Sequence, residues 1–218
     1  CMGFNIGRQL GELNVLEEEE IDALLGGNIG HSLLADQASW QTQQVAVFEV
    51  SSFQLERFAQ HRQVYGAVFT RIGSDHIDRH GTVANYQAAK GRLAKAATEF
   101  VIHAADDPVA NDFTCSASRR GYFSLEAPGP GSAGIEDGLL RVRGDSGPPT
   151  TILDQRAMKL IGDFQLENAL AASLAAYWLS AEAHPIGVAL ATAVPLPFRL
   201  QLLTSISGIQ IYDSAIST

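Results

Sequence analysis

Three short apolar runs, each followed by a polar loop or turn, constrain the fold of this chain most strongly. They are residues 45–50, 65–70 and 100–102. Strands that are buried on both faces read as continuous apolar runs, and in parallel sheets they alternate with helices. A helix expected over residues 83–98 fits this alternation. The sequence therefore predicts an α/β fold with a mostly parallel sheet that is flanked by helices and buried on both faces.

The second half of the chain has a different pattern. Residues 121–153 contain short apolar pieces divided by Gly, Pro and Ser, which predicts a small antiparallel β appendage made of hairpins. An alanine-rich helix over residues 165–179 and a shorter helix over residues 185–194 follow. Residues 200–205 and 209–212 then predict a β-hairpin.

Composition and charge exclude several classes of function. The chain has 218 residues, of which 46% are hydrophobic and 18% charged, as in ordinary globular proteins. A net charge of −9 without a basic cluster argues against nucleic-acid binding. No apolar run is long enough for a membrane span. Cys1 and Cys115 are the only cysteines, so we expect no disulfide framework and a reducing, cytoplasmic location.

A carboxylate, two hydroxyls and an amide follow closely at the end of the first apolar run. Glu49 ends the expected strand, and Ser51, Ser52 and Gln54 come directly after it. In open α/β sheets ligands bind at the carboxyl ends of the strands. A carboxylate at a buried strand end requires a cation or hydrogen-bond donors. The sequence therefore predicts a ligand or cation site at Glu49.

The loop after the second apolar run is rich in possible metal ligands. It contains Asp75, His76, Asp78 and His80, and His and Asp side chains bind divalent metals. From the end of a neighbouring strand, this loop would reach the tip of Glu49. A solvated polar loop explains the composition equally well. A metal hydrolase built on the four loop side chains is a further alternative.

Five other polar residues have ordinary interpretations when each is taken alone. Lys90 lies on an expected helix and reads as a surface charge, and Asn28 lies in a glycine-rich turn that favours a left-handed residue. Asn168 reads as a partly exposed residue of the alanine-rich helix, while Arg199 and Asp213 flank the expected hairpin as a surface pair.

Several motifs occur together in an order and spacing that resemble the central domain of the Mur ligase family. They are residues 26–30, 49–56, 75–79, 86–90, 105–107, 168–171 and 213–214. Residues 51–56 (Ser-Ser-Phe-Gln-Leu-Glu) are most similar to the members that add D-glutamate. The resemblance runs from about residue 26 to the end and implies a sheet like that of P-loop NTPases.

The resemblance implies an ATP-dependent ligase of peptidoglycan biosynthesis, which adds D-glutamate to UDP-N-acetylmuramoyl-L-alanine. In this reaction ATP phosphorylates a carboxylate, an amine attacks the acyl phosphate, and an amide forms, with Mg²⁺ neutralising the phosphates. The implied metal ligands are Glu49, His76 and a carbamylated Lys90. Lys90 and His76 are also the implied catalytic residues.

The resemblance also assigns the remaining site residues and the partners. Contacts with the UDP-sugar peptide substrate are implied for Asn28, Ser51, Gln54 and His76. The implied ATP-binding residues are Asn168, Arg199 and Asp213. We therefore expect a monomer whose partners are this small-molecule substrate and an amino acid, with no nucleic acid and no membrane insertion.

The chain departs from the family pattern in ways that put its activity in doubt. The phosphate loop Gly-Thr-Asn-Gly-Lys-Ser/Thr, expected before Gly26, is missing, and residues 2–8 lack its lysine and hydroxyl. Other departures are Arg71 for Asn, Phe164-Gln165 for His-Asn, Phe198 for His and Ala215-Ile216 for Lys-Ala. Phosphoryl transfer depends almost entirely on charge stabilisation, so we expect no turnover by this polypeptide alone.

We expect three parts along the chain. Residues 1–25 are a divergent or incomplete N-terminal segment, residues 26–205 the Mur ligase central domain, and residues 206–218 the hairpin and the start of a link to a missing C-terminal domain. Both chain ends are expected to be cut.

Two further alternatives remain open. One is a non-catalytic Mur-ligase-like binding module, which Ala215 favours and the joint presence of Glu49, His76 and Lys90 opposes. The other is a related ligase that adds a different amino acid, or glutamates to folate.

Overall fold

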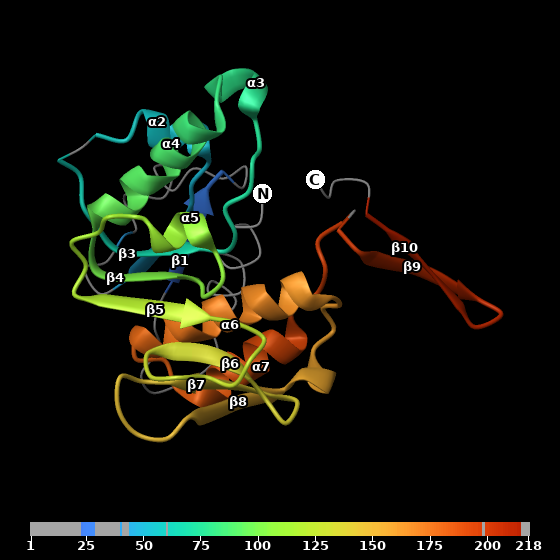
Figure 1. Cartoon of the computed structure of the whole chain (residues 1–218). Coiled ribbons are helices and arrows are strands. Elements are labelled where there is room, and N and C mark those ends of the chain that lie inside the picture. Colours follow the sequence, from blue (N-terminus) through green and yellow to red (C-terminus); the bar gives the residue numbers. More distant parts are fainter. Residues whose placement is uncertain (1–22, 29–39, 41–43, 60, 198, 215–218) are drawn as a thin grey trace.

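A six-stranded sheet in the order β3-β4-β5-β6-β7-β8 forms the centre of the computed structural model, which describes residues 23–28, 40, 44–59, 61–197 and 199–214 (Figure 1). Its strands are β3 (Val64–Phe69), β4 (Ala97–Ala104), β5 (Arg119–Phe123), β6 (Ser132–Glu136), β7 (Leu139–Arg143) and β8 (Thr150–Asp154). Strands β3 to β6 pair in parallel, and β7 and β8 are antiparallel to their neighbours. The predicted fold class is confirmed. The antiparallel part begins at β6 rather than at Gly121, because β5 pairs in parallel with both of its neighbours.

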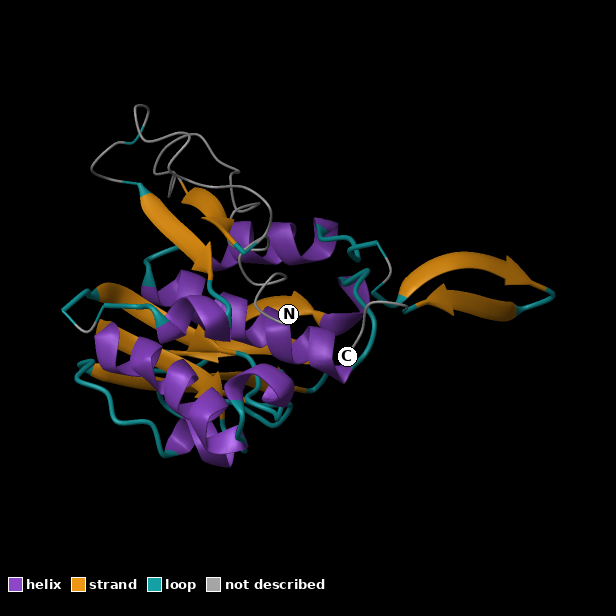
Figure 2. Cartoon of the chain, turned by 90° about the horizontal axis from the view of Figure 1, so that it is seen from above, coloured by secondary structure: helices purple, strands orange, loops and turns teal. Residues whose placement is uncertain are grey.

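Helices cover both faces of this sheet (Figure 2). They are α2 (Ser52–Glu56), α3 (Ile77–His80), α4 (Val83–Ala96), α5 (Pro108–Asn111), α6 (Asp163–Trp178) and α7 (Ala183–Thr192), with a 3-10 turn at Gln155–Ala157. Along β4, Val101 packs with the residues under α4, whereas Phe100 and Ile102 pack with α6. Since alternate side chains of a strand point to opposite faces, α4 and α6 lie on opposite sides.

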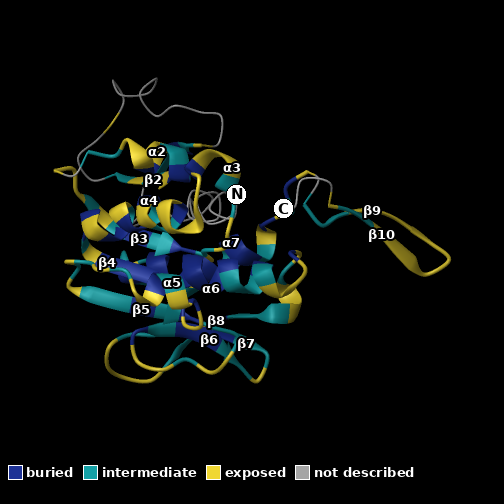
Figure 3. Cartoon of the chain, turned by 45° about the horizontal axis from the view of Figure 1, so that its top comes forward, coloured by how far each residue is buried: buried dark blue, intermediate teal, exposed yellow. Residues whose placement is uncertain are grey.

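Helix α6 is the centre of the hydrophobic core (Figure 3). Leu170 and Leu174 are completely buried, as are Ala169 and Ala171. The helix contacts β4, β5, β6 and β7 on one side and α7 on another. Its alanine-rich sequence follows from this position, because small side chains allow the sheet and a second helix to approach closely.

Strands β1 (Ala23–Gly27) and β2 (Val45–Glu49) form a separate parallel pair. The sequence placed Gly26 and Gly27 in a turn, which the structure corrects, because both belong to β1. The prediction that residues 45–50 are buried on both faces is also wrong, since Phe48 is 53% exposed. A continuous apolar run in the sequence does not show whether one face of the strand is exposed to solvent.

The predicted hairpin is confirmed as β9 (Gln201–Ile206) and β10 (Ile209–Asp213), which project away from the body (Figures 1 and 2). Ser207 and Gly208 both have positive φ, as tight hairpin turns require. The predicted boundaries of the three parts of the chain remain predictions. Within the described part of the chain, no helix is long and apolar enough to cross a membrane.

His103 is a fully buried histidine in β4. Its Nδ1 donates to the carbonyl oxygen of Ala104 at 2.9 Å, and its Nε2 has no hydrogen-bond partner among the residues that the structure describes. Burial lowers the pKa of His103 and Arg120 acts in the same direction, while the hydrogen bond to Ala104 and the charge of Asp107 only partly oppose this shift. The imidazole is therefore held neutral in the folded protein.

Acidification should destabilise the protein through His103. Because the pKa is below its ordinary value of 6.5 only in the folded state, the unfolded chain binds more protons below that pH. The free energy of unfolding therefore falls as pH drops below about 6.5. Urea unfolding between pH 5 and 8 should show a smaller fall for His103→Leu than for the wild type. Replacing the exposed His61 by Gln should leave the fall unchanged, and equal slopes for His103→Leu and wild type would contradict the assignment.

Candidate functional site

The ends of β1 and β2 bring Asn28 and Glu49 together. The parallel register pairs Gly27 with Glu49, so Asn28 follows directly beside the carboxylate. The Asn28 backbone N–H donates to the Glu49 carbonyl at 2.9 Å, and its Nδ2 lies 3.4 Å from Oε1 of Glu49. Gly27 has φ of 103°, and a Cβ there would lie 2.2 Å from the Glu49 carbonyl oxygen. Only glycine permits this close approach of the two strands.

Glu49 is a buried carboxylate whose negative charge is only partly balanced by neighbouring groups. The residue is 8% exposed, and its Oε2 has no hydrogen-bond partner within the described part of the chain. Burial raises the pKa of Glu49, while the Asn28 amide and the charges of Arg199 and Lys90 counteract that rise. An uncompensated buried oxygen of this kind is what a bound cation would satisfy.

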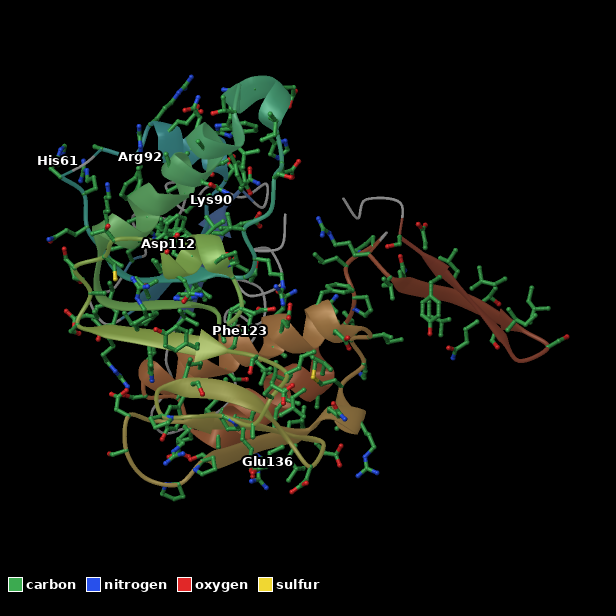
Figure 4. The ribbon with its side chains drawn as sticks, viewed as in Figure 1. His61, Lys90, Arg92, Asp112, Phe123 and Glu136 are labelled. Carbon is green, nitrogen blue, oxygen red and sulfur yellow. The ribbon has the colours of Figure 1, made fainter. Side chains whose placement is uncertain are left out.

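Lys90 extends from α4 in the same region and is not the surface charge that its helix position suggested (Figure 4). Burial lowers the pKa of Lys90, and the attraction of Glu49 and Asp75 only partly offsets this effect. Its Nζ lies 5.8 Å from the centre of the Tyr86 ring. The surroundings thus increase the fraction of the neutral amine, which is the nucleophilic form of lysine.

Ser51 and Gln54 form the N-terminal capping box of α2. The Ser51 backbone N–H donates to Oε1 of Gln54 at 2.8 Å, and the Gln54 N–H donates to Oγ of Ser51 at 3.3 Å. Their spacing of three residues is the sequence signal for this motif. The two predicted substrate-binding residues therefore also cap the N-terminus of α2. A bound ligand would use the hydrogen-bonding groups of Ser51 and Gln54 that the capping box does not occupy.

His76 lies in the loop after β3 in the left-handed conformation, with φ of 53°. The structure places its Nε2 3.4 Å from Oδ2 of Asp75, and its ring centre 5.0 Å from that of Phe53. About half of its side chain is exposed. The other loop histidine, His80, is buried and engaged elsewhere. Across the described residues no three or more His, Cys, Asp or Glu side chains form a group that would hold a metal, which disfavours the hydrolase alternative.

Arg71, which departs from the family pattern, joins three elements. Its Nε donates to Oε2 of Glu167 on α6 at 3.0 Å, and its Nη2 to Oδ2 of Asp106 at 3.2 Å. These bonds raise the pKa of Arg71. The next residue is anchored as well, because the Ile72 N–H donates to Oδ2 of Asp107 at 2.8 Å. The loop that leads to His76 is thereby tied to the α6 turn that carries Asn168.

The predicted ATP-binding residues are spread over two regions. Asn168 lies on α6 and is only 2% exposed. Arg199 precedes the hairpin and acts electrostatically on Glu49, whereas Asp213 ends β10 opposite Gln201. The departures at residues 2–8, Phe198 and 215–216 lie outside the described residues.

One hollow of about 400 Å³ lies between α4 and the segment that contains α5. Gly91, Lys95, Asp112 and Phe113 contribute to its lining, and none of its lining residues is a predicted site residue.

Comparison with known proteins identifies the family. The model of the Mur ligase middle domain matches residues 21–176. The chain belongs to the Mur ligase family. The protein named UDP-N-acetylmuramoylalanine--D-glutamate ligase from Pelotomaculum thermopropionicum is 30% identical over 207 residues, which are 94% of this chain and 45% of that protein. The protein of the same name from Geobacillus kaustophilus is 34% identical over 209 residues, with the same coverage.

Solved structures agree on the fold. The MurF ligase from Thermotoga maritima in complex with ADP superposes with a TM-score of 0.66 and 16% identity, covering 97% of this chain and 50% of that chain. This Mur ligase chain thus spans about half the length of the relatives that it matches.

Proposed function

We propose that this protein takes part in ATP-dependent amide ligation in peptidoglycan biosynthesis, as the middle domain of a ligase that adds D-glutamate to UDP-N-acetylmuramoyl-L-alanine. The observation that carries the proposal is the buried Glu49 carboxylate, one oxygen of which has no hydrogen-bond partner among the described residues, in the same electrostatic environment as the partly buried Lys90. The names of the relatives at 30% and 34% identity support D-glutamate as the added amino acid. The proposal also includes that the reaction takes place in the cytoplasm. The protein is proposed to be a monomer that binds neither nucleic acid nor membrane.

Glu49, His76 and Lys90 are the residues that would hold Mg²⁺. When bound, Mg²⁺ neutralises the phosphate charge of ATP. Glu49 and His76 alone provide few ligands, and no cluster of three His, Cys, Asp or Glu side chains occurs among the described residues. A neutral Lys90 amine can react with CO₂ to give a carbamate and a proton, which replaces a potential cation by an anionic oxygen ligand. The lowered pKa of Lys90 favours this reaction because it increases the fraction of free amine.

The remaining roles in the proposal come from the resemblance to the Mur ligase family. Asn28, Ser51, Gln54 and His76 bind the UDP-sugar peptide, and Asn168, Arg199 and Asp213 bind ATP. Asn28 supports this assignment because it is held beside Glu49, and Ser51 because it lies two residues further on. The capping box fixes the backbone at Ser51 and Gln54, which orients both side chains before a ligand binds.

Calorimetry with Mg²⁺ and ATP tests the proposal. We expect no measurable binding of Mg-ATP to this chain, and binding to a variant in which residues 2–8 are replaced by a segment with Gly-Thr-Asn-Gly-Lys-Thr. The restored lysine and hydroxyl would supply the missing phosphate and Mg²⁺ contacts. A variant with the same segment but Ala for the lysine is the matched control.

If neither chain binds Mg-ATP while both are folded, the ATP-site assignment of Asn168, Arg199 and Asp213 is wrong. A non-catalytic binding module is then the better function. Ala215, which stands where the family pattern has lysine, is the observation that favours that second candidate.

A further inference from the structure

Helix α3 has only four residues, so its position depends on its neighbours. A single helical turn is not stable by itself in water. His76 precedes it with φ of 53° and Gly81 follows it with φ of 76°, so the chain changes direction at both ends. A left-handed conformation at a residue other than glycine costs about 1–2 kcal/mol and persists only when surrounding contacts enforce it. The contacts of α3 therefore decide where His76 lies.

His80, the last residue of α3, connects this helix to α2. Its Nε2 lies 2.9 Å from Oγ of Ser52, and its Nδ1 lies 2.8 Å from Oε1 of Glu56. Ser52 and Glu56 are four residues apart, so they share one face of α2 and the imidazole spans a full turn of it. His80 is 5% and Ser52 3% exposed. The Ser52 contact is therefore a buried polar connection between two short helices, whereas Glu56 is exposed and its carboxylate lies close to Nδ1 of His80 without forming a hydrogen bond.

Phe53 of α2 lies among three side chains of the α3 segment. The His80 ring stacks on it at 5.3 Å between centres with an interplanar angle of 14°, and the His76 ring lies at 5.0 Å. The Arg79 guanidinium carbon lies 4.4 Å from the ring centre. One aromatic ring therefore contacts both histidines, and its own position is fixed by the stacking of His80.

Helix α4, which carries Lys90, contacts both His80 and the end of α2. Nδ2 of Asn85 donates to the His80 carbonyl oxygen at 2.8 Å, and Tyr86 packs edge-on against the His80 ring at 5.4 Å. Arg92 donates to the carbonyl oxygens of Leu55 and Glu56 at the end of α2 (Figure 4). The helices α2, α3 and α4 thus form one unit around His80.

The order hydroxyl, imidazole, carboxylate in Ser52, His80 and Glu56 is also that of a hydrolase relay. A nucleophile must be accessible to its substrate, and the Ser52 side chain is buried beneath His80. The geometry therefore supports a structural connection and not a second active site.

We propose that His80 is a positioning residue that acts through Phe53 to hold the His76 imidazole in place for the cation site of Glu49 and Lys90. The role of His76 at that site rests on the proposed function. The positioning of His76 by His80 and Phe53 does not, because it follows from the ring contacts and the short helix. The fit of the site to a cation rests on Oε2 of Glu49, which is buried without a hydrogen-bond partner in the part of the chain that the structure describes.

Two measurements on the whole chain separate these statements. The ring C–H signals of His76, measured by NMR at one fixed pH, report its position relative to Phe53. Calorimetry with Mn²⁺ alone reports the cation site. In His80→Leu and Phe53→Leu the His76 signals should move towards those of an exposed histidine. The dissociation constant for Mn²⁺ should rise about tenfold or more, as when other supporting residues of metal ligands are removed.

The exposed His61 provides the control, and His61→Gln should change neither measurement (Figure 4). Ser52→Ala removes the hydroxyl that contacts His80, and Glu56→Ala removes the carboxylate beside its Nδ1. Each variant should shift the same signals by a smaller amount, which keeps the test valid if His80→Leu does not fold. Unchanged His76 signals in folded variants would overturn the positioning role. A wild type that binds no Mn²⁺ would overturn the proposed cation site, while the NMR result would still decide the positioning.

Discussion

Replacing Glu49 by Gln should abolish binding of divalent cations and at the same time stabilise the protein. Glutamine keeps the shape of the side chain and the oxygen that faces Asn28, but it removes the buried negative charge. A cation would lose its main anionic ligand, so we expect the dissociation constant for Mn²⁺ to rise by more than about 100-fold, beyond the loss typical of supporting residues.

The gain in stability follows from the same charge. In the absence of a cation, the negative charge of Glu49 is buried with one oxygen unpartnered among the described residues, and burying a charged group costs more than burying the neutral amide that replaces it. The free energy of unfolding in urea, without divalent cations, should therefore be higher for Glu49→Gln than for the wild type.

The control for this prediction is Glu126→Gln, which removes an exposed carboxylate from a loop. Neither cation affinity nor the free energy of unfolding should change in that variant. Wild-type affinity for Mn²⁺ in Glu49→Gln would show that the carboxylate is not a ligand, whatever happens to stability.

Replacing Leu174 by Ala should cause a large loss of stability, about 3–5 kcal/mol. Leu174 is completely buried in α6 at the centre of the core. It packs so closely on β5 that a Cβ on Gly121 would lie 3.0 Å from its Cδ2. Truncation leaves a cavity between helix and sheet, and neither can move to fill it without losing its other contacts.

Urea unfolding measures this effect, with Leu203→Ala as the matched control. Leu203 lies on β9 and is 56% exposed, so its truncation should change the free energy of unfolding by less than about 0.5 kcal/mol. If the two variants lose the same amount, α6 is not the centre of the core that the structure shows.

Several elements could be predicted because the signal is local. The strand at residues 64–69, the helix α4 and the hairpin turn at Ser207 and Gly208 follow from apolar runs, helical periodicity and turn residues. The sequence also pointed to Glu49, because a carboxylate directly after an apolar run is unusual and its burial requires compensation.

Other features depend on contacts between distant residues, which no local pattern contains. Strand β1 was missed because its glycines resemble a turn, and only the pairing of Gly27 with Glu49 explains them. Lys90 reads as a surface charge until the fold partly buries it within the electrostatic influence of Glu49. One hydrogen-bond partner of Arg71 is Glu167, which is 96 residues away in the chain.

The sequence by itself determined the fold class, the family and the chemical types present at the candidate site, since these depend on periodicity and on residue identity. Only the tertiary structure decided that Glu49 has an oxygen without a partner among the described residues, that burial lowers the pKa of Lys90, and that His80 contacts α2 from the end of α3. The physical reason is that solvation, charge and the position of a short helix are properties of the surroundings. Those surroundings are assembled from segments that are far apart in the chain.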